Sequence, residues 1–184
     1  MKNLFLALLA MVAFVACNNT ESDYNYELEF ENGMFVSGAV EPITYEQFCE
    51  EVAGHCWERV ASNEIKSNGT LGSDNYWGGM EGGAPGIFNI EPTLLTYYST
   101  FVGADVMGKG YMNFPIRYDS NSIYIDDDNV YEYYILKIDG NQMTCIENAG
   151  LSSLGYHFVL SKFRRMSNDE LSALKRDYTI DFSR

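Results

Sequence analysis

Between residues 56 and 163 the sequence is a series of short apolar and aromatic segments, separated at short intervals by turn residues. Asn68-Gly69 and Asp139-Gly140 are turn dipeptides, because Asn, Asp and Gly tolerate positive φ. Interior glycines and prolines argue against long helices here. The spacing predicts an all-β fold, either an antiparallel sandwich or a barrel. The expected strands are 56–66, 70–71, 87–90, 93–102, 106–118, 122–125, 130–138, 142–146 and 155–163.

Two short helices are predicted to flank these strands. Thr44 and Gln47 have the spacing of a capping box, in which each side chain bonds the other residue's backbone at a helix start. Ser167 and Glu170 repeat that spacing near the C-terminus. An amphipathic helix this short is not stable alone, so each should pack against the strands.

The first 17 residues are typical of an export signal. A single Lys2 precedes an apolar run from Leu4 to Ala16, and polar residues follow directly after Cys17. A charged start, a short apolar stretch and a small residue before the cleavage point are the marks of a secretory signal peptide. The run is shorter than the roughly 20 residues that span a membrane. We therefore expect residues 1–16 to be removed.

The remaining chain divides into a tether with an N-terminal extension, 17–43, and one domain, 44–184. Within the extension, residues 26–36 alternate in polarity and contain Asn32-Gly33, which predicts a small hairpin. The formal net charge of the chain is −14. Nucleic acid is therefore not an expected partner, because phosphate binding needs clustered Lys and Arg.

Phe14-Val15-Ala16-Cys17 resembles the lipobox of bacterial lipoprotein signals. The resemblance implies cleavage before Cys17, lipidation of that cysteine, and location in the cell envelope as an outer-membrane lipoprotein. The membrane would then be a partner through the lipid anchor, since an acidic chain gains little from anionic lipid. The alternative is an ordinary signal peptide followed by a coincidental cysteine.

Three further segments resemble the lipocalin-like lipoproteins of Bacteroides and related bacteria. They are Gly54-His55-Cys56-Trp57, the hairpin YYILKIDGNQM at 133–143, and the closing FVLSKF at 158–163. The resemblance covers about 44–165, with Gly-x-x-Trp in place of the lipocalin Gly-x-Trp. It implies an antiparallel up-and-down barrel of about eight strands with a short N-terminal and a C-terminal helix. In such a barrel Trp57 would close the floor and the interior would hold one small ligand.

Aromatic side chains are the candidate ligand contacts. Trp77 stands in the Gly-rich segment 72–86, which could cover the barrel mouth. Tyr97, Tyr111 and Tyr133 could stack on a sugar or an apolar ligand. The alternative is that the loop is a connector and that the tyrosines are core and surface residues of alternating strands.

Catalytic and metal chemistry find little support in the sequence. Residues 126–129 (DDDN) offer oxygen ligands for calcium, but they lack EF-hand spacing and fit a charged hairpin turn. His55 and His157 have no recognisable catalytic partner. We therefore expect no catalytic residue, metal or cofactor. Three cysteines besides Cys17 leave their pairing open: Cys49, Cys56 and Cys145.

These observations predict a non-enzymatic, membrane-anchored barrel that binds a small apolar or glycan ligand in the cell envelope. A second hypothesis is a structural or protein-interaction lipoprotein with a solid core, acting through its loops and N-terminal extension. A third is a hydrolase whose two carboxylates cannot be identified from sequence.

Overall fold

The structure, a computed structural model, describes residues 28–31, 34–38, 40–66, 69–74, 86–102, 107–125, 131–152 and 155–183. Several sequence predictions lie outside these ranges, namely the signal segment 1–16, Cys17, Trp77 and the acidic turn 126–129. They therefore stay predictions. In the described ranges, no helix has both the length and the apolar character needed to cross a membrane.

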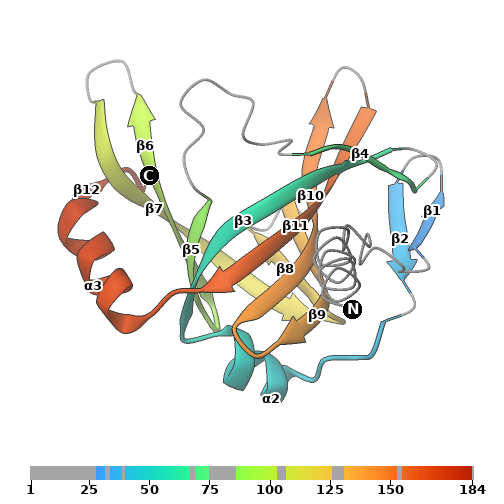
Figure 1. The fold of residues 1–184 in the computed structure, drawn as a ribbon, viewed down its shortest axis with the longest axis horizontal. Coiled ribbons are helices and arrows are strands. Elements are labelled where there is room, and N and C mark those ends of the chain that lie inside the picture. Colours follow the sequence, from blue (N-terminus) through green and yellow to red (C-terminus); the bar gives the residue numbers. More distant parts are fainter. Residues whose placement is uncertain are drawn as a thin grey trace, which may run out of the picture.

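Eight antiparallel strands close into a barrel (Figure 1). Each strand pairs with the next along the barrel, and the last pairs back with the first. The predicted up-and-down antiparallel barrel with an N-terminal and a C-terminal helix is thus confirmed. Its strands are β3 (His55–Ile65), β5 (Ile87–Glu91), β6 (Leu94–Val102), β7 (Met107–Asp119), β8 (Ser122–Ile125), β9 (Tyr131–Asp139), β10 (Gln142–Ser152) and β11 (Gly155–Arg165).

Tight turns set the register of the hairpins. Ser120 and Asn121 link β7 to β8 with φ of 51° and 69°, which is the twist that a two-residue turn between antiparallel strands requires. Gly140, with φ of 58°, turns β9 into β10 as the sequence predicts. β10 continues to Ser152, well beyond the predicted end at residue 146.

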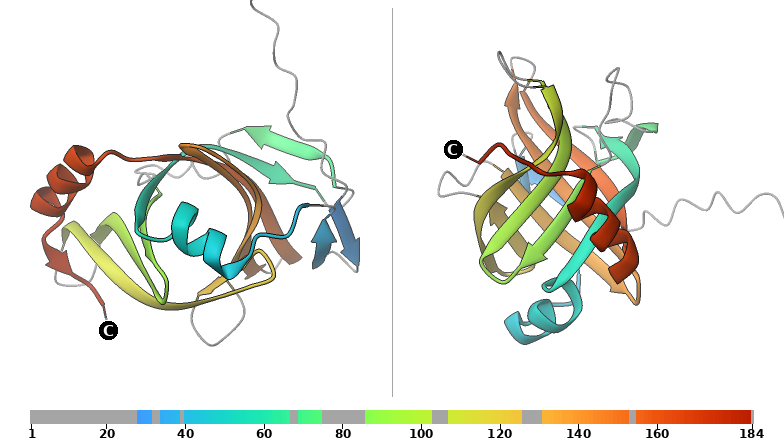
Figure 2. Two further views of the ribbon diagram at one scale, coloured as in Figure 1. Left: turned by 90° about the horizontal axis from the view of Figure 1, so that it is seen from below. Right: turned by 90° about the vertical axis from the view of Figure 1, so that its left-hand side faces the viewer.

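One end of the barrel is closed by a helical segment, α2 (Tyr45–Gln47) running into the single π-helical turn η1 (Phe48–Val52) (Figure 2). Phe48, Val52 and Trp57 have no exposed surface there. The Trp57 indole Nε1 donates a hydrogen bond of 3.0 Å to the Val52 carbonyl oxygen, which joins the first barrel strand to the helical segment. These side chains form the apolar floor of the barrel together with inward-facing isoleucines.

Both predicted capping boxes are present, at Thr44 and at Ser167. The second begins α3 (Asn168–Asp177). The Arg164 guanidinium donates hydrogen bonds of 3.2 and 2.8 Å to the Glu170 carboxylate. Those bonds, with the backbone and hydroxyl bonds from Ser167, lower the pKa of Glu170 to about 2.

The C-terminal part of the chain covers the outer wall of the barrel (Figure 2). Leu174 of α3 packs against Cys56 and Tyr98, which lie on the outer faces of β3 and β6. Beyond α3, the two-residue strand β12 (Ile180–Asp181) pairs in parallel with β7 at Gly110. β12 therefore lies along part of β7 that β8, which pairs only with residues 116–119, leaves uncovered.

Three shorter features complete the fold. β1 (Leu28–Glu31) and β2 (Met34–Gly38) form the predicted N-terminal hairpin. β4 (Leu71–Asp74) pairs with β3 and extends into the segment that the sequence analysis assigns to a Gly-rich loop. The three described cysteines are free thiols, namely Cys49, Cys56 and Cys145.

Candidate functional site

Above the apolar floor, charged side chains point into the barrel. Arg59 of β3 lies opposite Phe163 of β11, and Glu147 of β10 lies opposite Tyr133 of β9. Directly opposed residues of paired strands share a face. Phe163 belongs to the interior core and Tyr133 packs against that core, so Arg59 and Glu147 are also directed inward.

Arg59 and Glu147 form a bidentate ion pair inside the barrel. Arg59 Nε donates to Glu147 Oε1 at 3.0 Å, and Arg59 Nη2 donates to Glu147 Oε2 at 2.6 Å. The two side chains keep only 14% and 6% of their surface exposed. Such a parallel two-bond geometry is the strong form of an arginine–carboxylate contact, and it fixes both groups relative to the barrel wall.

Four aromatic rings surround the ion pair. The Arg59 guanidinium carbon lies 5.6 Å from the ring centroids of both Phe88 and Phe163, within the range of cation–π contact. The Tyr97 ring stacks on Phe88 at 5.2 Å, and the Tyr133 ring meets Phe88 edge-on at 5.5 Å. We call Arg59, Glu147 and these four rings the interior site.

Burial shapes the electrostatics of the interior site. It raises the pKa of Tyr133, and the nearby charge of Glu147 raises it further, so the phenol keeps its proton at neutral pH. Burial alone would lower the pKa of Arg59, but the charge and hydrogen bonds of Glu147, together with the nearby Tyr133 and Tyr97, outweigh the effect of burial, and the pKa is raised. Within the described part of the chain, the Tyr133 hydroxyl has no hydrogen-bond partner. The site thus offers fixed donors and acceptors beside aromatic surfaces.

The residues proposed from sequence fall in different places. Tyr97 and Tyr133 come together in the interior site, and each is only partly buried. Tyr111 lies on the outer wall, where its ring packs near Tyr98 under the C-terminal segment, so it does not join them. Trp57 lies in the floor below the interior site. Trp77 lies outside the described residues.

The sequence analysis missed both members of the ion pair. Arg59 is two residues after the floor residue Trp57, which places both on the inner face of β3. Glu147 continues the inward alternation of Met143 and Cys145 along β10. That period of two was the available signal, but the predicted strand ends at residue 146, one residue before Glu147.

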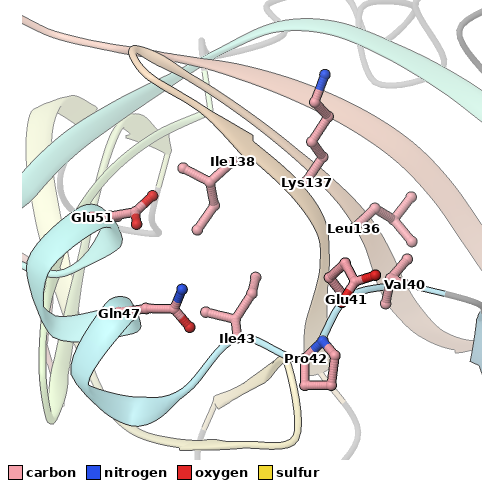
Figure 3. Close-up of a pocket in the computed structure, with 9 residues that line it drawn as sticks. All are labelled: Val40, Glu41, Pro42, Ile43, Gln47, Glu51, Leu136, Lys137 and Ile138. Atoms are coloured by element: carbon pink, nitrogen blue, oxygen red, sulfur yellow. The ribbon is translucent and has the colours of Figure 1, made fainter.

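A separate pocket of about 470 Å³ lies outside the barrel at its closed end (Figure 3). Gln47 and Glu51 project from the helical segment on one side, and β9 supplies the other wall through Leu136, Lys137 and Ile138. Its base is the connector 40–43, which Asn121 fixes by hydrogen bonds with Ile43 N and the Glu41 carbonyl oxygen.

A smaller pocket of about 280 Å³ lies on the outer wall. Tyr98, Tyr111, Tyr178 and Lys175 contribute to its lining, so it lies between β6, β7 and the end of α3. Among the residues that the structure describes, no group of three or more His, Cys, Asp or Glu side chains is placed to hold a metal ion. Neither a protein-family model nor a curated protein sequence matches the chain.

Proposed function

We propose that the chain is a lipocalin-like lipoprotein of the outer membrane that binds a small ligand in its barrel. The ligand would lie on the interior site, above the floor and away from the helical segment. The proposed role is binding, with no catalytic residue, and the lipid anchor at Cys17 would hold the barrel at the membrane.

The Arg59–Glu147 pair is the observation that carries this proposal. A barrel whose only task was stability could fill these positions with apolar side chains, as it does in the floor. Here the lining changes from apolar side chains to a fixed ion pair beside two partly buried tyrosines. Binding sites for small molecules combine apolar walls with a few oriented polar groups in this way.

Native mass spectrometry of the purified, lipid-modified chain in detergent tests the proposal. The protein is incubated with an extract of cell envelope, passed through a desalting column and examined for a bound mass. We expect a stoichiometric adduct that is lost on denaturation. A chain that retains no adduct would contradict ligand binding and favour the structural or interaction role.

The anchor is tested separately. Replacing Cys17 by serine should move the protein from the membrane fraction to the soluble envelope fraction, because the acyl chains are gone. A Cys17→Ser chain that stays with the membrane in high salt would contradict lipid anchoring at this residue.

A further inference from the structure

We infer that the ligand of the interior site is a neutral, hydroxyl-rich molecule of the saccharide class. The inference rests on the proposed function and adds the chemistry of the ligand to it. The interior site combines one guanidinium, one carboxylate, phenol hydroxyls and the aromatic rings around them.

A charged ligand gains little at this site. Arg59 and Glu147 neutralise each other through two hydrogen bonds, so their summed charge is zero. An anionic ligand would compete with Glu147 for Arg59, and it would approach a chain of net charge −14. A cationic ligand would in turn compete with Arg59, which is already seated over two aromatic rings.

A purely apolar ligand would bury polar groups without replacing their water. The Glu147 carboxylate and the Tyr133 hydroxyl would lose solvent and receive no hydrogen bond in exchange. Leaving a buried donor or acceptor unpaired costs more than a made hydrogen bond contributes. An apolar ligand would suit the apolar side chains of the floor, but Phe48, Trp57 and their neighbours already pack together there.

A saccharide matches both the polar groups and the aromatic rings of the interior site. Its hydroxyls both donate and accept, so one ring can donate to the carboxylate of Glu147 and accept from Tyr133 or Arg59. The C–H face of a sugar ring complements the negative face of an aromatic ring, and Tyr97 and Tyr133 are only partly covered by protein. Neutral polar ligands of this kind need no change in the charge of the site.

The test separates this inference from the proposed function. The envelope extract is partitioned between chloroform–methanol and water, and each fraction is offered to the purified lipid-modified chain before native mass spectrometry. We expect an adduct from the aqueous fraction whose mass and acid hydrolysis products are those of neutral sugars. An adduct only from the organic fraction, without sugar, overturns the saccharide inference and leaves ligand binding intact. No adduct from either fraction overturns both.

Two tyrosine variants, one inside the barrel and one on its outer wall, test where the ligand binds. Tyr133→Phe removes one inward hydroxyl that makes no hydrogen bond in the described structure, so the fold should be retained. We expect it to weaken adduct formation from the aqueous fraction about threefold to tenfold, the effect of one hydrogen bond. Tyr111→Phe, on the outer wall, should bind like the unaltered chain. Equal binding by Tyr133→Phe, with its thermal midpoint unchanged, would place the ligand elsewhere and overturn the inference.

Discussion

The Arg59–Glu147 pair gives a stability prediction whose size can be worked out from its geometry. Glu147→Gln keeps the shape of the side chain but removes the carboxylate charge that Arg59 faces in the barrel, where the arginine side chain is 14% exposed. Unit charges about 4 Å apart interact by about 4 kcal/mol at an effective dielectric constant of 20. Breaking a buried pair by removing one member costs about 3–5 kcal/mol. We therefore expect Glu147→Gln to lower the free energy of unfolding by about 3 kcal/mol.

Removing both charges together should cost far less. Arg59→Met combined with Glu147→Leu leaves no buried charge, and such replacements range from neutral to stabilising by about 1–4 kcal/mol. The thermodynamic cycle formed by the double variant and its two single variants should give a coupling energy of about 3 kcal/mol or more. The double variant should thus unfold at a higher urea concentration than either single variant.

Urea unfolding at pH 7, followed by tryptophan fluorescence and circular dichroism, measures these free energies. Lys137→Gln is the matched control, because it breaks an ion pair of 3.1 Å with Asp139 on the surface, where both side chains are more than half exposed. Its effect should stay below about 1 kcal/mol. If the single variants at Arg59 and Glu147 lose no more free energy of unfolding than this control, water solvates the ion pair and the argument from burial fails.

Two further predictions concern the C-terminal part of the chain. Gly110→Ala would place a Cβ in a steric clash with the backbone carbonyl oxygen of Ile180, so β12 should detach and its amides should exchange faster with deuterium. In the control Gly108→Ala, the new Cβ meets only the tip of the Ile180 side chain, so β12 should stay docked. The lowered pKa of Glu170 contributes stability that is complete above about pH 4.5 and lost as the pH falls through about 2. The free energies of unfolding of the unaltered chain and of Glu170→Gln, measured in urea, should therefore converge as the pH falls from 5 to 2. A difference between them that does not change with pH would contradict this assignment.

Local signals in the sequence were sufficient for an antiparallel all-β fold and its two helices, whereas the barrel, rather than a sandwich, was expected from the resemblance to lipocalin-like lipoproteins. Turn dipeptides such as Asp139-Gly140 and the capping boxes at Thr44 and Ser167 act over a few residues, so they can be read without knowing the fold. The alternation of apolar residues likewise marks strands wherever one face is buried. β12 was not predicted, because it consists of only two residues and forms only by pairing with β7.

The face of each tyrosine could not be predicted in the same way. Tyr98 and Tyr111 alternate with the inward residues of β6 and β7, but α3 and the segment after it cover them, so both faces of these strands are apolar. Alternation then identifies two faces without saying which one is inside. The ion pair depends on two residues that are 88 positions apart, and only the closed barrel brings Arg59 and Glu147 together.

The Arg59–Glu147 pair is expected to affect stability and ligand binding differently, and one double variant distinguishes the two effects. Because a buried ion pair contributes little net stability compared with apolar residues of similar size, stability alone gives no reason for charges at these two positions. The Arg59→Met, Glu147→Leu double variant should therefore fold as well as the unaltered chain and yet lose the ligand, since the fixed donors and acceptors are gone. A double variant that is both stable and fully able to retain the adduct would show that the ion pair does not contact the ligand.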